Sequence, residues 1–209
     1  MKLLFVLVLT AALAPAAAIA AKPGSVTISL ARPVVVFGQT DTLSGVVSTQ
    51  AAGEKVDVLA RPLGQANLTP LATVETAANG AWSYTATPTI ETSYQAKSKG
   101  VTSQVVMVKV RPRMVLAQLS ANSAKVTVTA ARSFSGKFVL VQRLTLNGPL
   151  TLKKVVLSTT STVANGTETS ATFRVRLAGA AARLRAVMPT SQTSPGYIAG
   201  SSNVLRFQR

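Results

Sequence analysis

Short segments in which apolar and polar residues alternate recur along this chain from residue 26 onward. In the first of them, Val26, Ile28 and Leu30 alternate with Thr27 and Ser29. Later segments are also rich in Val and Thr, lie about ten residues apart, and are separated by Gly, Pro, Asn and Ser. A strand with one buried face has this period of two, whereas an amphipathic helix has a period near 3.6. The pattern therefore predicts an all-β protein.

The first half of the chain contains enough alternating segments for one complete sandwich. Asn79-Gly80 is a dipeptide typical of turns with positive φ, and it leads into Trp82 and Tyr84, whose rings are expected on one face. We expect both rings in the core, with stacking on a sugar as the alternative for an exposed pair. The seven expected strands lie at residues 26–30, 43–47, 56–60, 71–74, 82–86, 94–96 and 105–110. This density of strands is typical of an immunoglobulin-like sandwich.

Arg111-Pro112-Arg113 interrupts the alternation. Proline cannot donate to a strand ladder, so residues 111–113 are expected to form a short, stiff linker. The same plan then repeats less regularly, with runs at residues 115–119, 125–130, 138–143, 152–157, 171–177, 183–187 and 204–207. We therefore predict two tandem immunoglobulin-like β-sandwich domains, at residues 22–110 and 114–209.

The first twenty-one residues have the pattern of a secretory signal peptide. Lys2 supplies a positive charge, residues 3–13 form an apolar run, and Ala18-Ile19-Ala20 has the small-x-small spacing of a cleavage site. The run is shorter than the ~20 residues of a comfortable membrane span. Residues 1–21 are therefore predicted to be removed, which would leave the mature chain without a transmembrane anchor and either secreted, extracellular or associated with the cell envelope.

Composition argues against most catalytic chemistry. The chain has neither cysteine nor histidine, so thiol nucleophiles, disulfides and the commonest general base and metal ligand are excluded. Its six carboxylates are Asp41, Glu54, Asp57, Glu75, Glu91 and Glu168. Glu54 and Asp57 are the only close pair in sequence, and we expect them to be solvated turn charges. We expect no catalytic, cofactor-binding or metal-binding residues, and therefore a protein that is not an enzyme.

Charge is distributed unevenly between the two halves. Residues 22–113 carry nine Lys or Arg and five carboxylates, a net of +4, whereas residues 114–209 carry twelve and one, a net of +11. An exported domain with this excess is expected to attract an anionic cell-surface polymer or glycan, and to bind nucleic acid only non-specifically. The alternative is that the charge only keeps the protein soluble.

Four arginines in the second half are the candidate anion-binding residues. In the runs 173–177 and 183–186, alternation is expected to point Arg174, Arg176, Arg183 and Arg185 outward. The short connection between the runs predicts a hairpin, which would place all four guanidinium groups on one exposed face. The planar fork of arginine suits carboxylate, phosphate or sulfate groups. The alternative is an ordinary solvated outer face.

Residues 26–113 resemble the Ig-like repeat domains of secreted and surface-exposed bacterial proteins. The resemblance is carried by Leu43-Ser44-Gly45, by Gly53 with the run 56–62, by Asn79-Gly80-Ala81-Trp82-Ser83-Tyr84-Thr85, by Thr87-Pro88-Thr89, by Tyr94-Gln95-Ala96 and by the closing run 106–110. It implies a spacer, stalk or adhesive module. The cysteine pair of antibody-type domains is missing, and the second half carries the resemblance less clearly, since Leu184 stands where the first half has Tyr94.

Three functional hypotheses follow from these observations. The leading one is a secreted, non-enzymatic, structural or adhesive protein of the cell surface. The alternative is a soluble module that binds polyanions or glycans through its basic second domain. An accessory domain of a secreted enzyme system is the third.

Overall fold

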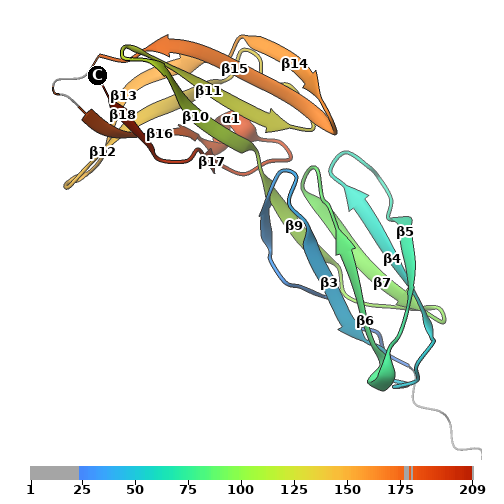
Figure 1. Ribbon diagram of the computed structural model, residues 1–209. Coiled ribbons are helices and arrows are strands. Elements are labelled where there is room, and N and C mark those ends of the chain that lie inside the picture. The colour runs from blue at the N-terminus through green and yellow to red at the C-terminus, as the bar shows by residue number, and fades with distance from the viewer. Residues whose placement is uncertain (1–23, 177–178, 180, 209) are drawn as a thin grey trace, which may run out of the picture.

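The computed structural model describes residues 24–176, 179 and 181–208, and these residues form an all-β fold with one short helix. The predicted signal peptide at residues 1–21 lies outside the described residues. The strands are arranged in four sheets, two on each side of Pro112, and the described sheets contain no strand pairing across it (Figure 1). The expectation of a β-sandwich-like, all-β protein is confirmed.

Residues 24–111, here called the first half, contain a three-stranded and a six-stranded sheet. The smaller sheet has the order β1-β3-β6, and the larger has the order β2-β9-β7-β4-β5 with β8 paired to β7. Their bounds are Ser29–Leu30 (β1), Val34–Val36 (β2), Asp41–Val46 (β3), Lys55–Pro62 (β4), Thr69–Glu75 (β5), Ala81–Ala86 (β6), Thr92–Ser98 (β7), Val101–Thr102 (β8) and Val106–Arg111 (β9). All pairs are antiparallel except β2 with β9.

Residues 113–208, here called the second half, contain a four-stranded and a five-stranded sheet. The first has the order β10-β11-β15-β14, and the second, here called the β12 sheet, has the order β13-β12-β16-β17 with β18 paired to β16. Their bounds are Arg113–Ser120 (β10), Ser123–Ala130 (β11), Phe138–Thr145 (β12), Gly148–Val156 (β13), Thr159–Val163 (β14), Gly166–Arg174 (β15), Ala181–Met188 (β16), Gly200–Ser201 (β17) and Leu205–Gln208 (β18). The helix α1 spans Thr190–Thr193.

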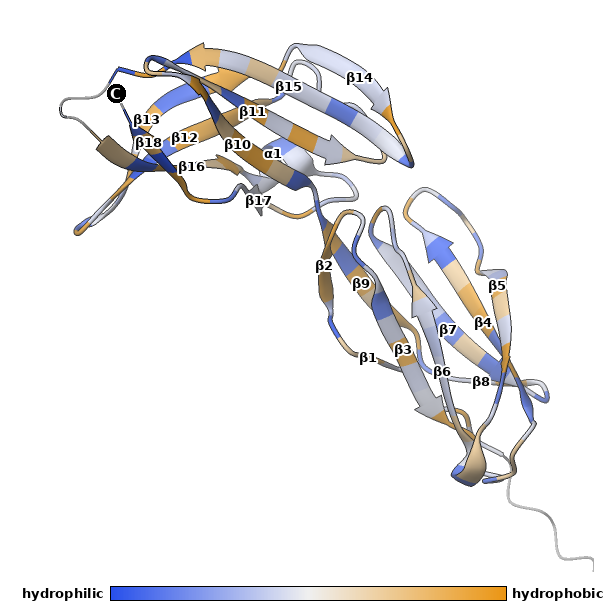
Figure 2. Cartoon of the chain, in the orientation of Figure 1, coloured by the Kyte–Doolittle hydropathy of each residue, from blue (hydrophilic) through white to orange (hydrophobic). Residues whose placement is uncertain are grey.

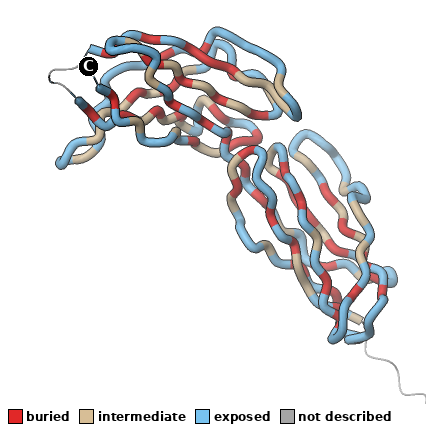
Figure 3. The backbone as a smooth tube through the Cα atoms, in the orientation of Figure 1, coloured by how far each residue is buried: buried red, intermediate tan, exposed pale blue. Residues whose placement is uncertain are grey.

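The alternation in the sequence produces the burial pattern of the strands. In β11, Ala124, Val126, Val128 and Ala130 are fully buried and alternate with half-buried neighbours. The same period of two gives the striped colouring of strands in Figures 2 and 3. Each pair of sheets therefore buries its apolar faces against each other, as sandwich packing requires.

The aromatic residues of the first half lie in the core, as expected. Trp82 is buried, and Tyr84 on the same strand is half-buried and packs against the core. The turn before them also has the predicted backbone conformation, with φ of 65° at Asn79 and 69° at Gly80. That turn is a single 3-10 turn at Ala78–Gly80 rather than a two-residue hairpin.

The segment predicted as a linker, residues 111–113, is shorter than expected because its first and last residues belong to strands. β9 ends at Arg111 and β10 begins at Arg113, so only Pro112, which is buried, separates the two strands. The segment that follows α1 returns to this point: Glu91 N donates to Gly196 O (3.0 Å) and Ile198 N donates to Val110 O (3.0 Å). These contacts hold the two halves end to end.

Candidate anion-binding surface

The orientation predicted for the four arginines is largely confirmed. Arg174 ends β15, Arg176 follows it, and both are exposed beside buried Phe173 and Val175. On β16, Arg183 is exposed and Arg185 half-buried; they flank Leu184, which is fully buried.

The expected hairpin between these two runs is wrong. β15 pairs with β11 and β14, whereas β16 pairs with β12, β17 and β18, so the two strands belong to different sheets. The apolar faces of the two runs are opposed across the core instead of lying side by side. Alternation fixes which way a side chain points, but it does not choose the neighbouring strand. The four arginines therefore do not form one face.

Arg174 and Arg176 instead lie beside a lysine in a hollow of about 400 Å³, here called the Arg174 hollow. On β13, Lys153 lies opposite Val141 and Lys154 lies opposite Leu140, and because successive strand residues alternate, the two lysines point to opposite faces. Lys153 thereby lines the Arg174 hollow together with the apolar side chains Val141, Leu152, Phe173 and Val175. Three cations and four apolar side chains therefore line one hollow.

A second hollow, of about 660 Å³ and here called the Arg183 hollow, contains Arg143, Arg183 and Arg206. Arg183 and Arg206 are direct cross-strand partners on β16 and β18. Like charges in that position repel each other, so this pair costs stability unless an anion neutralises it. The sequence did not lead us to Arg143 or Arg206. The outward direction of Arg206 could have been predicted from buried Phe207 beside it, but its pairing with Arg183 could not.

Within the part of the chain that the structure describes, Arg185 is the one of the four arginines whose side chain donates a hydrogen bond. Its Nε donates to Gln142 Oε1 (3.0 Å), the residue directly opposite on β12. Lys154, on the same face of the β12 sheet, places its Nζ 4.0 Å from the centroid of the Phe138 ring, a cation–π contact. These two cations are held against the sheet.

The β12 sheet contains no carboxylate along its strands. Its five strands carry Arg143, Lys153, Lys154, Arg183, Arg185 and Arg206. In the described part of the second half, the one ion pair joins Lys125 to Glu168 (3.8 Å), and both residues lie in the other sheet. Among the described residues, no carboxylate on this sheet therefore offsets the positive charge of its two faces.

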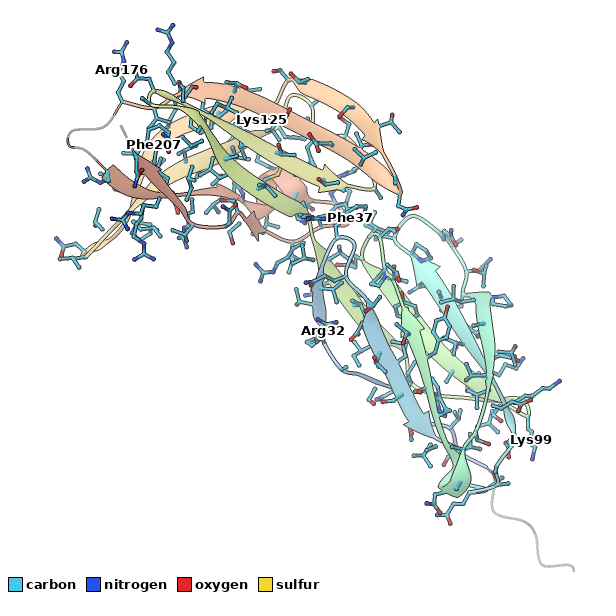
Figure 4. The ribbon with its side chains drawn as sticks, viewed as in Figure 1. Arg32, Phe37, Lys99, Lys125, Arg176 and Phe207 are labelled. Atoms are coloured by element: carbon cyan, nitrogen blue, oxygen red, sulfur yellow. The ribbon has the colours of Figure 1, made fainter. Side chains whose placement is uncertain are left out.

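The β12–β13 hairpin contributes residues to both hollows, and its turn carries an exposed leucine. Leu146, in this turn, is fully exposed, at 106% of its reference area, and Leu150 on β13 is 57% exposed. Gly148 closes the turn with a φ of 108°, where a Cβ would be strained. Figure 1 shows the hairpin projecting from the end of the second half that lies away from Pro112, and Figure 4 shows Arg176 at this same end.

The other charge cluster considered from the sequence is Glu54, and the expectation of a solvated turn charge is wrong for it. Glu54 is buried and accepts hydrogen bonds from Thr49 Oγ1 (2.6 Å), Ser98 Oγ (2.7 Å) and Lys99 Nζ (3.1 Å). Asp57 is separate from it and accepts from Thr73 Oγ1 (2.7 Å). The carboxylate of Glu54 thus ties the loop after β3 to the end of β7.

Acid is expected to weaken the first half through this residue. The hydrogen bonds from Thr49, Ser98 and Lys99 lower the pKa of Glu54 from 4.5 to about 2. Since the folded-state pKa is depressed, the stabilisation is present above about pH 4.5 and is lost as the pH falls toward 2. Urea unfolding at pH 7, 4 and 2.5, followed by Trp82 fluorescence, should show this loss. Glu54→Gln should show a smaller pH dependence, and an unchanged dependence would contradict the assignment.

The described residues contain neither a candidate metal site nor a candidate membrane-spanning helix. Among them, no group of three or more potential metal-binding side chains comes together. No helix in the described ranges has the length and apolar character to cross a membrane. No family model matches the chain, and comparison with curated proteins finds no match.

Proposed function

We propose that this protein is secreted, is not an enzyme, and serves structure or adhesion at the cell surface through two tandem immunoglobulin-like domains. The observation that carries this proposal is the end-to-end junction at Pro112, which gives an elongated molecule with its sheets on either side (Figure 1). A spacer or stalk needs such a stiff connection. The signal-like pattern of residues 1–21 and the resemblance of residues 26–113 support it further.

Strand order supports the immunoglobulin-like assignment in both halves. Such domains place strands A, B, E and D in one sheet and C, F and G in the other. In the second half, the orders β10-β11-β15-β14 and β13-β12-β16-β18 correspond to A-B-E-D and C′-C-F-G. In the first half, β1-β3-β6 corresponds to A-B-E, and β9-β7-β4-β5 corresponds to G-F-C-C′.

Export and processing test the compartment on which this proposal depends. The protein recovered from the medium or envelope of its source should have an N-terminus near Ala21 or Lys22, as read by N-terminal sequencing, because the cleavage pattern ends there. The cytoplasmic fraction is the control and should contain little product. A cytoplasmic product that retains Met1 would contradict a cell-surface role.

The second candidate function is binding of a polyanion through the second half. Two observations favour it: the two cationic hollows and the absence of carboxylates from the strands of the β12 sheet. The mature chain should bind inorganic polyphosphate, and the affinity should fall steeply with salt because Coulomb attraction is screened. Replacing Arg183 and Arg206 by Ser should weaken binding severalfold in fluorescence anisotropy. Replacing exposed Arg61 and Lys109 of the first half removes equal charge and should have a smaller effect.

A further inference from the structure

The β12–β13 hairpin combines two features that a soluble polyanion alone would not require. Its strands contribute Lys153 to the Arg174 hollow and Arg143 to the Arg183 hollow, so cations lie on both of its sides. Its turn presents Leu146, whose side chain makes no contact that removes it from water. Binding of a hydrophilic polymer would not transfer this exposed leucine from water to an apolar environment.

Further apolar side chains follow the same hairpin toward its base. Leu150, Leu152 and Val156 on β13 are 57%, 40% and 53% exposed, and Val204, which lines the Arg183 hollow, is 47% exposed. Apolar tip residues with cations behind them are the arrangement that proteins of the membrane interface use, since the apolar part reaches the acyl boundary while cations meet the headgroups.

We infer that this end of the second half docks on an anionic lipid surface. Leu146 enters the boundary between headgroups and acyl chains, and the arginines of the Arg183 hollow bind lipid phosphates. The cross-strand pair Arg183 and Arg206 then acquires the neutralising charge that no ion pair of the described residues supplies. Arg174, Arg176 and Lys153 bind phosphates on the other side of the hairpin. The inference rests on the second candidate function and names its partner.

A phosphate-bearing lipid fits this site better than a free polyanion because its acyl chains contact the exposed leucine while its phosphate contacts the arginines. The planar guanidinium groups pair with phosphate oxygens in a bidentate manner, which fixes the orientation of the hairpin. The elongated molecule would then stand away from the surface, with its first half directed outward (Figure 1).

The experiment measures binding of the mature full-length chain to vesicles by sedimentation. The vesicles contain phosphatidylglycerol mixed with phosphatidylcholine, or phosphatidylcholine alone, and polyphosphate binding is measured in parallel. We expect binding to the anionic vesicles, little binding to phosphatidylcholine alone, and weakening by salt. Leu146→Ser should reduce vesicle affinity about tenfold, as expected for returning most of one leucine side chain to water, while polyphosphate affinity stays unchanged.

Two further variants separate the contribution of Leu146 from that of the arginines. Leu71→Ser removes an exposed leucine from β5 in the first half and should leave vesicle binding unchanged. Arg183→Ser with Arg206→Ser should weaken vesicle binding about tenfold or more, since each cation near an anionic membrane contributes severalfold, and should weaken polyphosphate binding as well. Circular dichroism of each variant establishes that the fold is retained.

The possible failures are distinguishable. If the chain binds polyphosphate but not anionic vesicles, or if Leu146→Ser binds vesicles like the unaltered chain, the lipid partner is wrong while the polyanion function stands. If it binds neither, both are wrong.

Discussion

Replacing Gly45 by Ala is expected to destabilise the first half by about 3 kcal/mol, at the upper end of what overpacking a core usually costs. A Cβ on Gly45 would lie 2.7 Å from both the carbonyl carbon of Thr27 and Nε1 of Trp82, and it would overlap the carbonyl oxygen of Thr27. Thr27 cannot move away easily, since its N donates to Val46 O (3.0 Å) and its Oγ1 accepts from Val46 N (2.9 Å).

The single tryptophan of the chain makes this effect easy to assign. Trp82 is directly opposite Gly45 on β6, so its fluorescence reports unfolding of the first half. Urea unfolding followed by this signal should show a clearly lower midpoint for Gly45→Ala. Gly24→Ala is the control, because its nearest neighbour would be Ser48 Oγ at 3.8 Å, an ordinary contact; its stability should change by no more than about 0.5 kcal/mol. Equal midpoints for Gly45→Ala and Gly24→Ala would contradict the packing described here.

Alternation predicted the orientation of side chains well, because burial of one strand face depends on period alone. It predicted the inward direction of Phe173, Val175 and Leu184 and the outward direction of the arginines between them. The choice of neighbouring strand depends on topology, and there the prediction of a hairpin was wrong. In the immunoglobulin-like order, strands E and F belong to different sheets, so the predicted fold class was itself inconsistent with a β15–β16 hairpin.

The sequence did not predict which residues long-range strand pairing brings together. Arg206 meets Arg183 only because β18 pairs with β16, and Glu54 accepts a hydrogen bond from Ser98, forty-four positions away. Leu146 is a different case. A leucine between β12 and β13 could have been noticed from the sequence, but its relation to the two cationic hollows depends on the long-range pairing that forms them.

Replacing Phe134 by Ala is expected to destabilise the second half by about 3–5 kcal/mol, the usual cost of truncating a buried phenylalanine. The side chain is only 1% exposed, and its ring meets the Tyr197 ring edge-on at a centroid distance of 5.7 Å. The guanidinium carbon of Arg132 lies 5.2 Å from the Phe134 ring centroid and 5.8 Å from that of Tyr197. Truncation removes the common neighbour of these two side chains.

Phe134→Ala should also weaken the contacts at the junction, because Tyr197 connects the two halves. Its hydroxyl accepts a hydrogen bond from Ala131 N (2.9 Å) and donates one to Thr89 O (2.5 Å). Urea unfolding followed by far-ultraviolet circular dichroism should show an early transition for Phe134→Ala, and a smaller shift for Phe134→Leu, which keeps more of the buried volume. Trp82 fluorescence should still unfold near its original midpoint, since the first-half core does not contain Phe134. If fluorescence and circular dichroism instead shift together, the halves unfold as one cooperative unit, which would contradict separate unfolding of the two cores.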